Sequence, residues 1–377
     1  MKKRLFQFYF FALSCFSMLS TSEAQATPTP IISANGPGIA MLRMSDTHYM
    51  SSATIHTNAY ADSTHSFDVI KDIEWAKPKG FSLKMDIYVP KTGKKSYPVI
   101  IIYHGGGWLV SPKEIMNDMS EYLASHSEFI VCNVQYRLLG DNANTTTMNE
   151  IVGDVFGAVV WVKEHIKAYK GDSSKIVVTG DSAGGHLAEM VVISGNNLGS
   201  EGFSKEPLSF IPTYLPKGKT AEDIKKKNGL SVQAAMISYG VFDLYTTALN
   251  GFETSSNPFW GYANAKPRGI FGASINAKEN PEYYKAISPL YNIPKASERK
   301  LPPQLVIVGT KDRLVTAAQQ YVKALKEAGQ PVEYWESEGR PHGFLDRGVN
   351  QNAGTSFVKD GAPAVDRMIA FLNTVFK

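Results

Sequence analysis

The stretch that decides the fold is KIVVTGDSAGGHLA, residues 175–188. Residues 175–179 form an apolar run typical of a central strand that is buried on both faces. The run leads into Gly-x-Ser-x-Gly with Ser182 at its centre, and residues 183–193 have the pattern of a helix. A serine at a sharp turn between strand and helix projects its hydroxyl from the sheet, and the glycines leave room for the strained backbone. We therefore predict that Ser182 is a catalytic nucleophile.

A glycine loop lies upstream of this serine, directly after a second apolar run at residues 99–103. It reads HGGGW, residues 104–108. Three consecutive glycines leave backbone N–H groups uncovered, and such donors stabilise the oxyanion of a tetrahedral intermediate. We predict an oxyanion hole of four backbone N–H groups, those of Gly105, Gly106, Gly107 and Ala183. We expect His104 to hold this loop rather than to carry a proton.

Two side chains beside these motifs are candidates for substrate contact. Trp108 ends the glycine loop, and Asp181 precedes the nucleophile. The sequence is equally consistent with Trp108 lining the substrate pocket and with Trp108 packing in the core. An ordinary tight turn and a flexible glycine loop are the alternatives to the two catalytic interpretations.

The order of residues along the chain identifies the general base. Where this kind of turn carries a catalytic serine, the acid and then the histidine follow it in sequence. Only His186 and His342 come after Ser182. His186 lies one turn along the helix that begins at the serine, so we expect it to point away from the reaction centre. We predict that His342, in a loop after the last strand, takes the serine proton.

The acid lies between the serine and His342 in sequence. Asp312 follows the apolar strand at residues 305–308, and catalytic groups collect at the carboxyl ends of parallel strands. We predict that Asp312 orients the imidazole and stabilises its protonated form. Asp243 is the reserve candidate, while Asp223 lies in a Lys-rich polar stretch.

The remaining pattern alternates between strands and helices, which predicts an α/β fold with an eight-stranded, mostly parallel sheet and helices on both faces. The strands are expected at residues 69–75, 83–89, 99–103, 130–134, 175–179, 232–238, 305–308 and 332–336. The helices are expected at residues 151–168, 183–193, 315–328 and 364–376. Two stretches, 195–231 and 243–300, break the alternation and are expected to form lid-like loop insertions.

The N-terminus has the composition of an export signal. A basic start at residues 2–4, an apolar run and the sequence Ala24-Gln25-Ala26 predict a signal peptide over residues 1–26, cleaved after Ala26. We expect a polar arm at 27–66, a catalytic domain at 67–377, and no stable membrane span after processing. The protein is then secreted or periplasmic, and Cys132, the one cysteine of the processed chain, is expected to be a buried, inert thiol.

Charge and composition exclude several function classes. A net charge of +4 without a basic, aromatic-rich stripe argues against a nucleic-acid partner. Histidines and cysteines do not occur at metal-ligand spacing, and the glycine loop lacks the Lys-Ser/Thr of a phosphate-binding loop, so we expect no metal and no cofactor. The oligomeric state is left open.

These motifs, in this order, resemble the hormone-sensitive-lipase-like branch of the α/β-hydrolase esterases. The resemblance runs from about residue 67 to the C-terminus, and residues 180–188 also look like bacterial acetyl and feruloyl esterases that act on plant polysaccharides. It implies a metal-free carboxylesterase acting on small-molecule or carbohydrate esters. The polar arm and the two long insertions depart from the family pattern, so the pocket cannot be inferred by analogy.

Three alternatives remain open. A lipase or a serine peptidase would use the same residues, and some proteins of this fold bind partners without catalysis. The aromatic insertion at 243–300, which contains Trp260, is either core and lid packing or a surface that stacks on carbohydrate.

Overall fold

The computed structural model describes residues 54–56, 60, 62–351 and 353–377, and its centre is a nine-stranded sheet in the order β1-β2-β3-β5-β4-β6-β7-β8-β9. The strands are β1 (Thr54–His56), β2 (Phe67–Ala76), β3 (Leu83–Pro90), β4 (Tyr97–Tyr103), β5 (Ile130–Val134), β6 (Gly171–Asp181), β7 (Ala234–Ser238), β8 (Gln304–Gly309) and β9 (Val332–Ser337). The six from β5 to β9 in that order pair in parallel, and the pairs at the β1 edge are antiparallel. The eight predicted strands and the mostly parallel sheet are confirmed.

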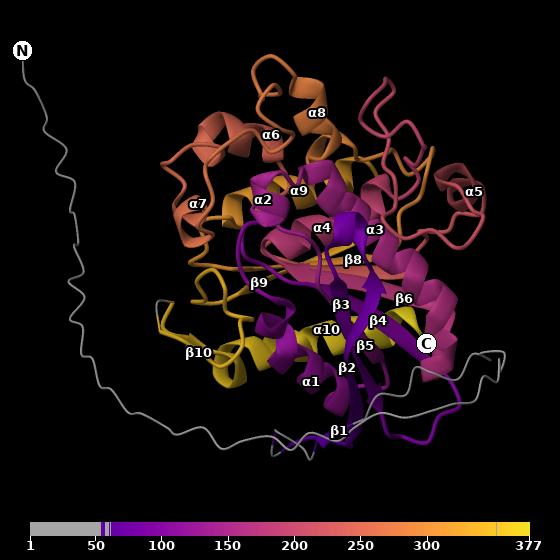
Figure 1. Cartoon of the computed structure of the whole chain (residues 1–377). Helices are drawn as coiled ribbons and strands as arrows, with labels where there is room; N and C mark the ends of the chain where they lie inside the picture. The colour runs from indigo at the N-terminus through magenta and orange to yellow at the C-terminus, as the bar shows by residue number, and fades with distance from the viewer. Residues whose placement is uncertain (1–53, 57–59, 61, 352) are drawn as a thin grey trace, which may run out of the picture. The chain divides into compact units, whose positions relative to one another are not determined.

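Long helices cover both faces of this sheet. They are α1 (Asn117–His126), α3 (Met148–His165), α4 (Ala183–Ser194), α9 (Val315–Glu327) and α10 (Ala362–Val375). Figure 1 shows α1 and α10 on one face and α3, α4 and α9 on the other. The α4 and α9 helices are joined by a buried hydrogen bond from the Tyr321 hydroxyl to the Glu189 carboxyl.

The helices on both faces of the sheet explain why the central strands are apolar along their whole length. Every residue of β5, β7 and β8 is buried, so these strands contain apolar runs instead of an alternating pattern. The β2 strand lies near the edge and alternates between buried and exposed positions along much of its length. Cys132 in β5 has no exposed surface, and burial raises the pKa of its thiol far above the usual range, as expected for an inert cysteine.

The first insertion connects the end of α4 to the start of β7, and the second connects the carboxyl end of β7 to the start of β8. The first contains α5 (Ala221–Lys226). The second contains α6 (Leu244–Thr247), a π-helical turn at Ala248–Phe252, α7 (Pro258–Tyr262) and α8 (Pro281–Ala286). Trp260 is buried, and its indole N–H donates to the carbonyl of Phe252. It therefore packs inside the insertion and does not present a face for stacking on carbohydrate.

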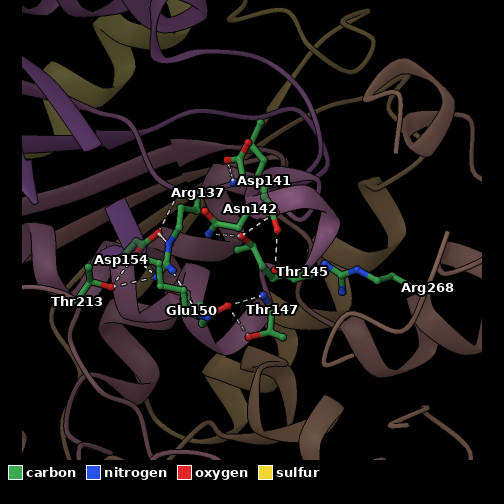
Figure 2. A network of polar contacts seen from close by, with 12 residues as sticks. Arg137, Asp141, Asn142, Thr145, Thr147, Glu150, Asp154, Thr213 and Arg268 are labelled. Atoms are coloured by element: carbon green, nitrogen blue, oxygen red, sulfur yellow. Dashed lines mark hydrogen bonds and ion pairs between the residues drawn. The ribbon is translucent and has the colours of Figure 1, made fainter. Parts of the chain in front are cut away.

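Arg268 anchors the second insertion to the loop between β5 and α3. It donates to the backbone carbonyls of Leu139, Asn144, Thr146 and Gly269. The loop that Arg268 binds includes a left-handed turn, α2 (Asp141–Asn144). The φ values at residues 142–144 are 53°, 57° and 63°. Figure 2 shows Arg268 beside this turn, with the Arg137–Asp154 ion pair on the other side of it.

Part of the predicted N-terminal arm is ordered on the sheet. Residues Thr54–His56 form β1, which pairs with β2, and the backbone N–H groups of Thr64 and His65 donate to the carbonyl of Ser125 at the end of α1. These segments belong to the polar arm predicted at residues 27–66, and the strand within it was not predicted. The predicted signal peptide and the rest of the arm up to residue 53 lie outside the described residues. Within the described residues, none of the helices has the length and apolarity needed to cross a bilayer.

Candidate active site

Ser182 lies at the turn between β6 and α4, at the carboxyl end of the central strand. Its φ and ψ are 51° and −116°, a conformation that non-glycine residues rarely adopt. The turn requires glycine nearby, because a Cβ on Gly184 would collide with the carbonyl oxygen of Tyr103 in β4. The strained backbone turns the Ser182 hydroxyl out of the sheet and toward the loop that contains His342.

A chain of hydrogen bonds connects the three predicted catalytic side chains. The Nε2 atom of His342 lies 2.9 Å from the hydroxyl oxygen of Ser182, and its Nδ1 atom lies 2.7 Å from Oδ2 of Asp312. Asp312 is 3% exposed, and its other oxygen accepts the N–H of Leu314. The carboxylate is thus fixed on both sides, and the imidazole is oriented to accept the serine proton.

The reserve acid, Asp243, has a different role. One of its oxygens caps α6 by accepting the N–H of Thr246, and the other accepts the hydroxyl of Tyr291. The carboxylate that pairs with Nδ1 of His342 is that of Asp312, so Asp312 and not Asp243 is in place to act as the acid.

The glycine loop supplies backbone donors beside the serine, although not all of those expected. Gly107 and Ala183 line the same pocket as Ser182. Gly106 and Gly107 have φ values of 114° and 60°, so the loop depends on glycine there. Gly105 packs against the buried side chain of Asp181, because a Cβ built on Gly105 would come within 2.5 Å of Asp181 Oδ2. Gly105 and Gly106 do not border the pocket, so their part in the oxyanion hole stays a prediction.

Asp181 does not contact the pocket. It is 2% exposed, and the Asp346 carboxyl lies close enough to raise its pKa further, although burial is the larger cause. Its Oδ1 atom has no recorded hydrogen-bond partner among the described residues. The sequence-based assignment of Asp181 to substrate contact therefore does not fit the structure. Its position beneath Gly105 instead supports the oxyanion loop.

The two other histidines of the motifs are structural. His104 is buried, stacks on Tyr136 at 4.3 Å, and has its Nδ1 atom 2.7 Å from the carbonyl oxygen of Gly105. His186 is also buried. Its Nε2 atom is hydrogen-bonded to the carbonyl oxygen of Ile287, and its Nδ1 atom accepts the indole N–H of Trp108. Burial lowers the pKa of each to about 4, so both are neutral near pH 7. His186 thereby fixes Trp108, which is 2% exposed and still borders the pocket.

Tyr239 is a residue of the site that the sequence patterns do not reveal. It directly follows β7, and its ring meets the His342 ring edge to face at 4.8 Å. Its hydroxyl accepts the N–H of Leu345, which holds the loop that carries His342. Its position at a strand end is the one signal that could have pointed to it.

The pocket in front of Ser182 has a volume of 380 Å³. Its apolar wall consists of Trp108, Val241, Phe252, Phe259 and Leu314. Its polar side chains besides Ser182 and His342 are Thr247, Asn250, Ser256, Asn257 and Arg313. Four of these five polar residues and two of the five apolar ones belong to the second insertion, which therefore forms a partial lid over the triad.

A larger hollow of 730 Å³ lies elsewhere, between the first insertion and the start of α3. None of the triad residues borders it. Arg137 and Glu150 on its wall are already engaged in the ion-pair network of Figure 2. We place the active site in the smaller pocket because the catalytic groups converge there. In the part of the chain that the structure describes, no three His, Cys, Asp or Glu side chains gather as metal ligands.

Comparison with known proteins identifies the family. The family model described as BD-FAE matches residues 85–327. Esterase LipQ of Mycobacterium tuberculosis is 30% identical over 255 residues, which is 66% of this chain and 50% of LipQ. An arylesterase of Saccharolobus solfataricus is 23% identical over 270 residues, 71% of this chain and 75% of that protein. The chain spans about half the length of LipQ.

A solved structure shows the same fold. Esterase 2 of Thermogutta terrifontis superposes with a TM-score of 0.56 at 22% sequence identity, over 81% of this chain and 94% of that one. At this identity the likeness concerns the fold alone. The chain therefore belongs to the BD-FAE family and has the α/β-hydrolase fold of the esterases that its sequence resembles.

Proposed function

We propose that this protein is a serine carboxylesterase. The observation that carries the proposal is the unbroken chain of hydrogen bonds from Asp312 through His342 to Ser182, which ends in an open pocket. The chemistry of such a chain is acyl transfer. The names of LipQ and of the arylesterase, two relatives of this chain, support the same reaction class.

The proposed mechanism has two steps. The Ser182 oxygen attacks the ester carbonyl carbon as Nε2 of His342 takes its proton, and the N–H groups of the predicted oxyanion hole stabilise the oxyanion. The C–O bond to the alcohol then breaks, and His342 returns the proton to the leaving oxygen. Water attacks the acyl-serine with His342 again as the base, and the carboxylic acid and free Ser182 result. Asp312 stabilises the imidazolium in both steps without taking the proton.

We propose short-chain or carbohydrate-linked esters as the substrates. A volume of 380 Å³ is near the lower end of the range for ligand pockets, roughly 300–1,000 Å³. Phe252 and Phe259 on the lid narrow the apolar side, which favours a compact acyl group over a long chain.

The test is hydrolysis of p-nitrophenyl esters from acetate to palmitate, with the Ser182→Ala variant beside the wild type. We expect activity on the short esters and a loss of about 10⁴-fold or more in the variant. Activity that peaks on palmitate would indicate a lipase. Absence of ester hydrolysis by the folded protein would contradict the proposal and favour a peptidase or a non-catalytic binding protein.

We also propose that the protein is exported, because residues 1–26 have the charge and apolar pattern of a signal peptide. The expected mature chain begins at Thr27. Intact-mass measurement of protein from the secreted and periplasmic fractions tests this. A full-length chain retained in the cytoplasm would contradict it.

A further inference from the structure

Arg313 is the one arginine or lysine among the residues that border the active-site pocket. It follows the catalytic acid directly, is exposed, and borders the same 380 Å³ pocket as Ser182. No aspartate or glutamate is among the residues recorded along this pocket. The Asp312 carboxylate next to it is buried and bound to His342 and to the N–H of Leu314. The pocket therefore has a positive charge with no acid on its wall.

The other arginines that the structure describes all have partners. Four of them bind carboxylates, namely Arg137, Arg340, Arg347 and Arg367. Two donate to backbone carbonyls, Arg268 and Arg299. Among the described residues, Arg313 has no recorded hydrogen bond or ion pair for its guanidinium group. This group is thus available to a ligand, and it lies where the substrate must enter.

We propose that Arg313 selects esters that carry a carboxylate close to the scissile bond. The inference rests on the proposed esterase function and names the substrate class of that site. A guanidinium binds a carboxylate through two parallel charge-assisted hydrogen bonds, with more geometric specificity than a lysine ammonium. The half-enclosed pocket strengthens this attraction relative to bulk water, and the unopposed charge draws anions toward the site.

The reaction itself gives a reason for a cation here. The tetrahedral intermediate places a negative charge on the former carbonyl oxygen, and a second negative charge on the substrate would repel it. Without a cation, an anionic ester is therefore a poorer substrate than its neutral analogue. Arg313 neutralises the second charge and reverses that order.

The carboxylate can belong to either half of the ester. On the acyl side the substrate is a hemiester of a dicarboxylic acid. On the alcohol side it is an acylated uronic acid, which agrees with the proposed carbohydrate-linked substrates. Asn250, an exposed lid residue on the same pocket, offers an amide that can bind sugar hydroxyls.

The experiment uses two matched pairs of esters with the full chain. The first pair is the p-nitrophenyl hemiester of glutaric acid against p-nitrophenyl pentanoate. The second is O-acetylated methyl galacturonoside against O-acetylated methyl galactoside. The readout is the ratio of kcat/KM for the anionic ester to kcat/KM for the neutral ester, measured for the wild type, Arg313→Gln and Arg313→Lys. Lys311→Gln is the control, because Lys311 is an exposed cation on the same loop that does not border the pocket.

We expect the wild type to prefer the anionic member of at least one pair, and the pair concerned identifies the half of the ester that carries the carboxylate. Arg313→Gln should lower that ratio about 10- to 100-fold. Arg313→Lys should retain part of it, and Lys311→Gln all of it. The preference should weaken with added salt. A folded protein that cleaves the neutral esters without preference, or whose preference survives Arg313→Gln, overturns this inference and leaves the esterase function standing. Failure to cleave any of the four esters overturns the esterase function as well.

Discussion

Ser182 combines a reactive hydroxyl with a backbone conformation that suits glycine. Its φ of 51° and ψ of −116° cost roughly 1–3 kcal/mol for a residue with a side chain. The surrounding packing of β6, α4 and the Tyr103 carbonyl keeps the turn in place. The strain is therefore a cost to stability that accompanies the exposed position of the hydroxyl.

This strain predicts an unusual order of stability among inactive variants. Ser182→Gly and Ser182→Ala both lack the hydroxyl, but only glycine adopts the turn without strain. We expect Ser182→Gly to be more stable than Ser182→Ala by about 1 kcal/mol, after the entropy that glycine loses on folding is included. Urea unfolding of the two proteins measures the difference. If the alanine variant is equally stable or more stable, the turn is not strained.

Asp181 predicts a pH dependence of stability. Burial, and then the Asp346 carboxyl, raise its pKa to about 8, whereas an unfolded aspartate titrates near 3.9. Between these values the folded protein holds a proton that the unfolded chain has lost. Asp181 therefore contributes most to stability at low pH, and this contribution falls as pH rises through the window, by up to about 1.4 kcal/mol per pH unit.

Asp181→Asn cannot ionise and keeps the size and shape of the side chain. We expect its free energy of unfolding to decline less than that of the wild type between pH 5 and pH 8. Some decline should remain, because burial also raises the pKa of Asp346. Denaturant titrations at the two pH values measure this, and an identical decline in both proteins would exclude Asp181 as the titrating group.

At the scale of elements, the long apolar patterns were enough to predict the eight strands β2 to β9 and the helices α3, α4, α9 and α10. The α1 helix was missed because its sequence, NDMSEYLASH, is mostly polar and only 10 residues long. The short helices of the insertions have too few residues for any period. Their conformation depends on contacts with the rest of the fold, such as those of Arg268.

The site shows the same division between local and tertiary signals. The triad could be predicted because a local motif fixes Ser182 and chain order limits the acid and the base. The contact between Asp181 and Asp346 joins residues far apart in sequence, and no local pattern indicates it. The burial of Asp181 against Gly105, away from the pocket, was missed because it likewise depends on tertiary packing.

The contacts of Arg268 lead us to predict that this residue holds the lid, the second insertion, against the rest of the domain. Its guanidinium joins the second insertion to the loop at residues 139–146, and Leu139 in turn donates to the carbonyl of Trp108. Arg268→Gln should lower stability by roughly 1.5–3 kcal/mol, the range for hydrogen bonds to charged groups. It should also raise KM for short esters several-fold with a smaller effect on kcat, because the triad lies on the sheet and not on the lid.

Arg367→Gln is the matched control for this prediction. Arg367 is 41% exposed and pairs with Glu333 at the surface, so its loss should cost less than about 1 kcal/mol and leave KM unchanged. Thermal unfolding of the two variants measures the loss of stability, and their ester kinetics measure the change in KM. An unchanged KM in Arg268→Gln would mean that the lid is held by its apolar contacts alone.

At the scale of the whole described domain, one buried ion pair connects segments that are distant in sequence. Arg137 follows β5, Asp154 belongs to α3, and Thr213 comes from the first insertion; Figure 2 shows the three side chains converging. Arg137 donates to both oxygens of Asp154 at 2.7 and 2.8 Å, and the Thr213 hydroxyl donates to the same carboxylate. The Arg137 side chain is 4% exposed and that of Asp154 is fully buried.

This pair predicts a large asymmetry between single and double replacement. Arg137→Met leaves the Asp154 carboxylate buried without its cation, which should cost about 3–5 kcal/mol of stability. Replacing both groups in Arg137→Met/Asp154→Leu removes the uncompensated charge, so the double variant should recover most of that loss. Guanidinium unfolding of the wild type, the single variant and the double variant measures the difference. The double variant could instead be as unstable as the single one. In that case Arg137 stabilises the fold by attaching Thr213 and the first insertion, and not by compensating the charge of Asp154.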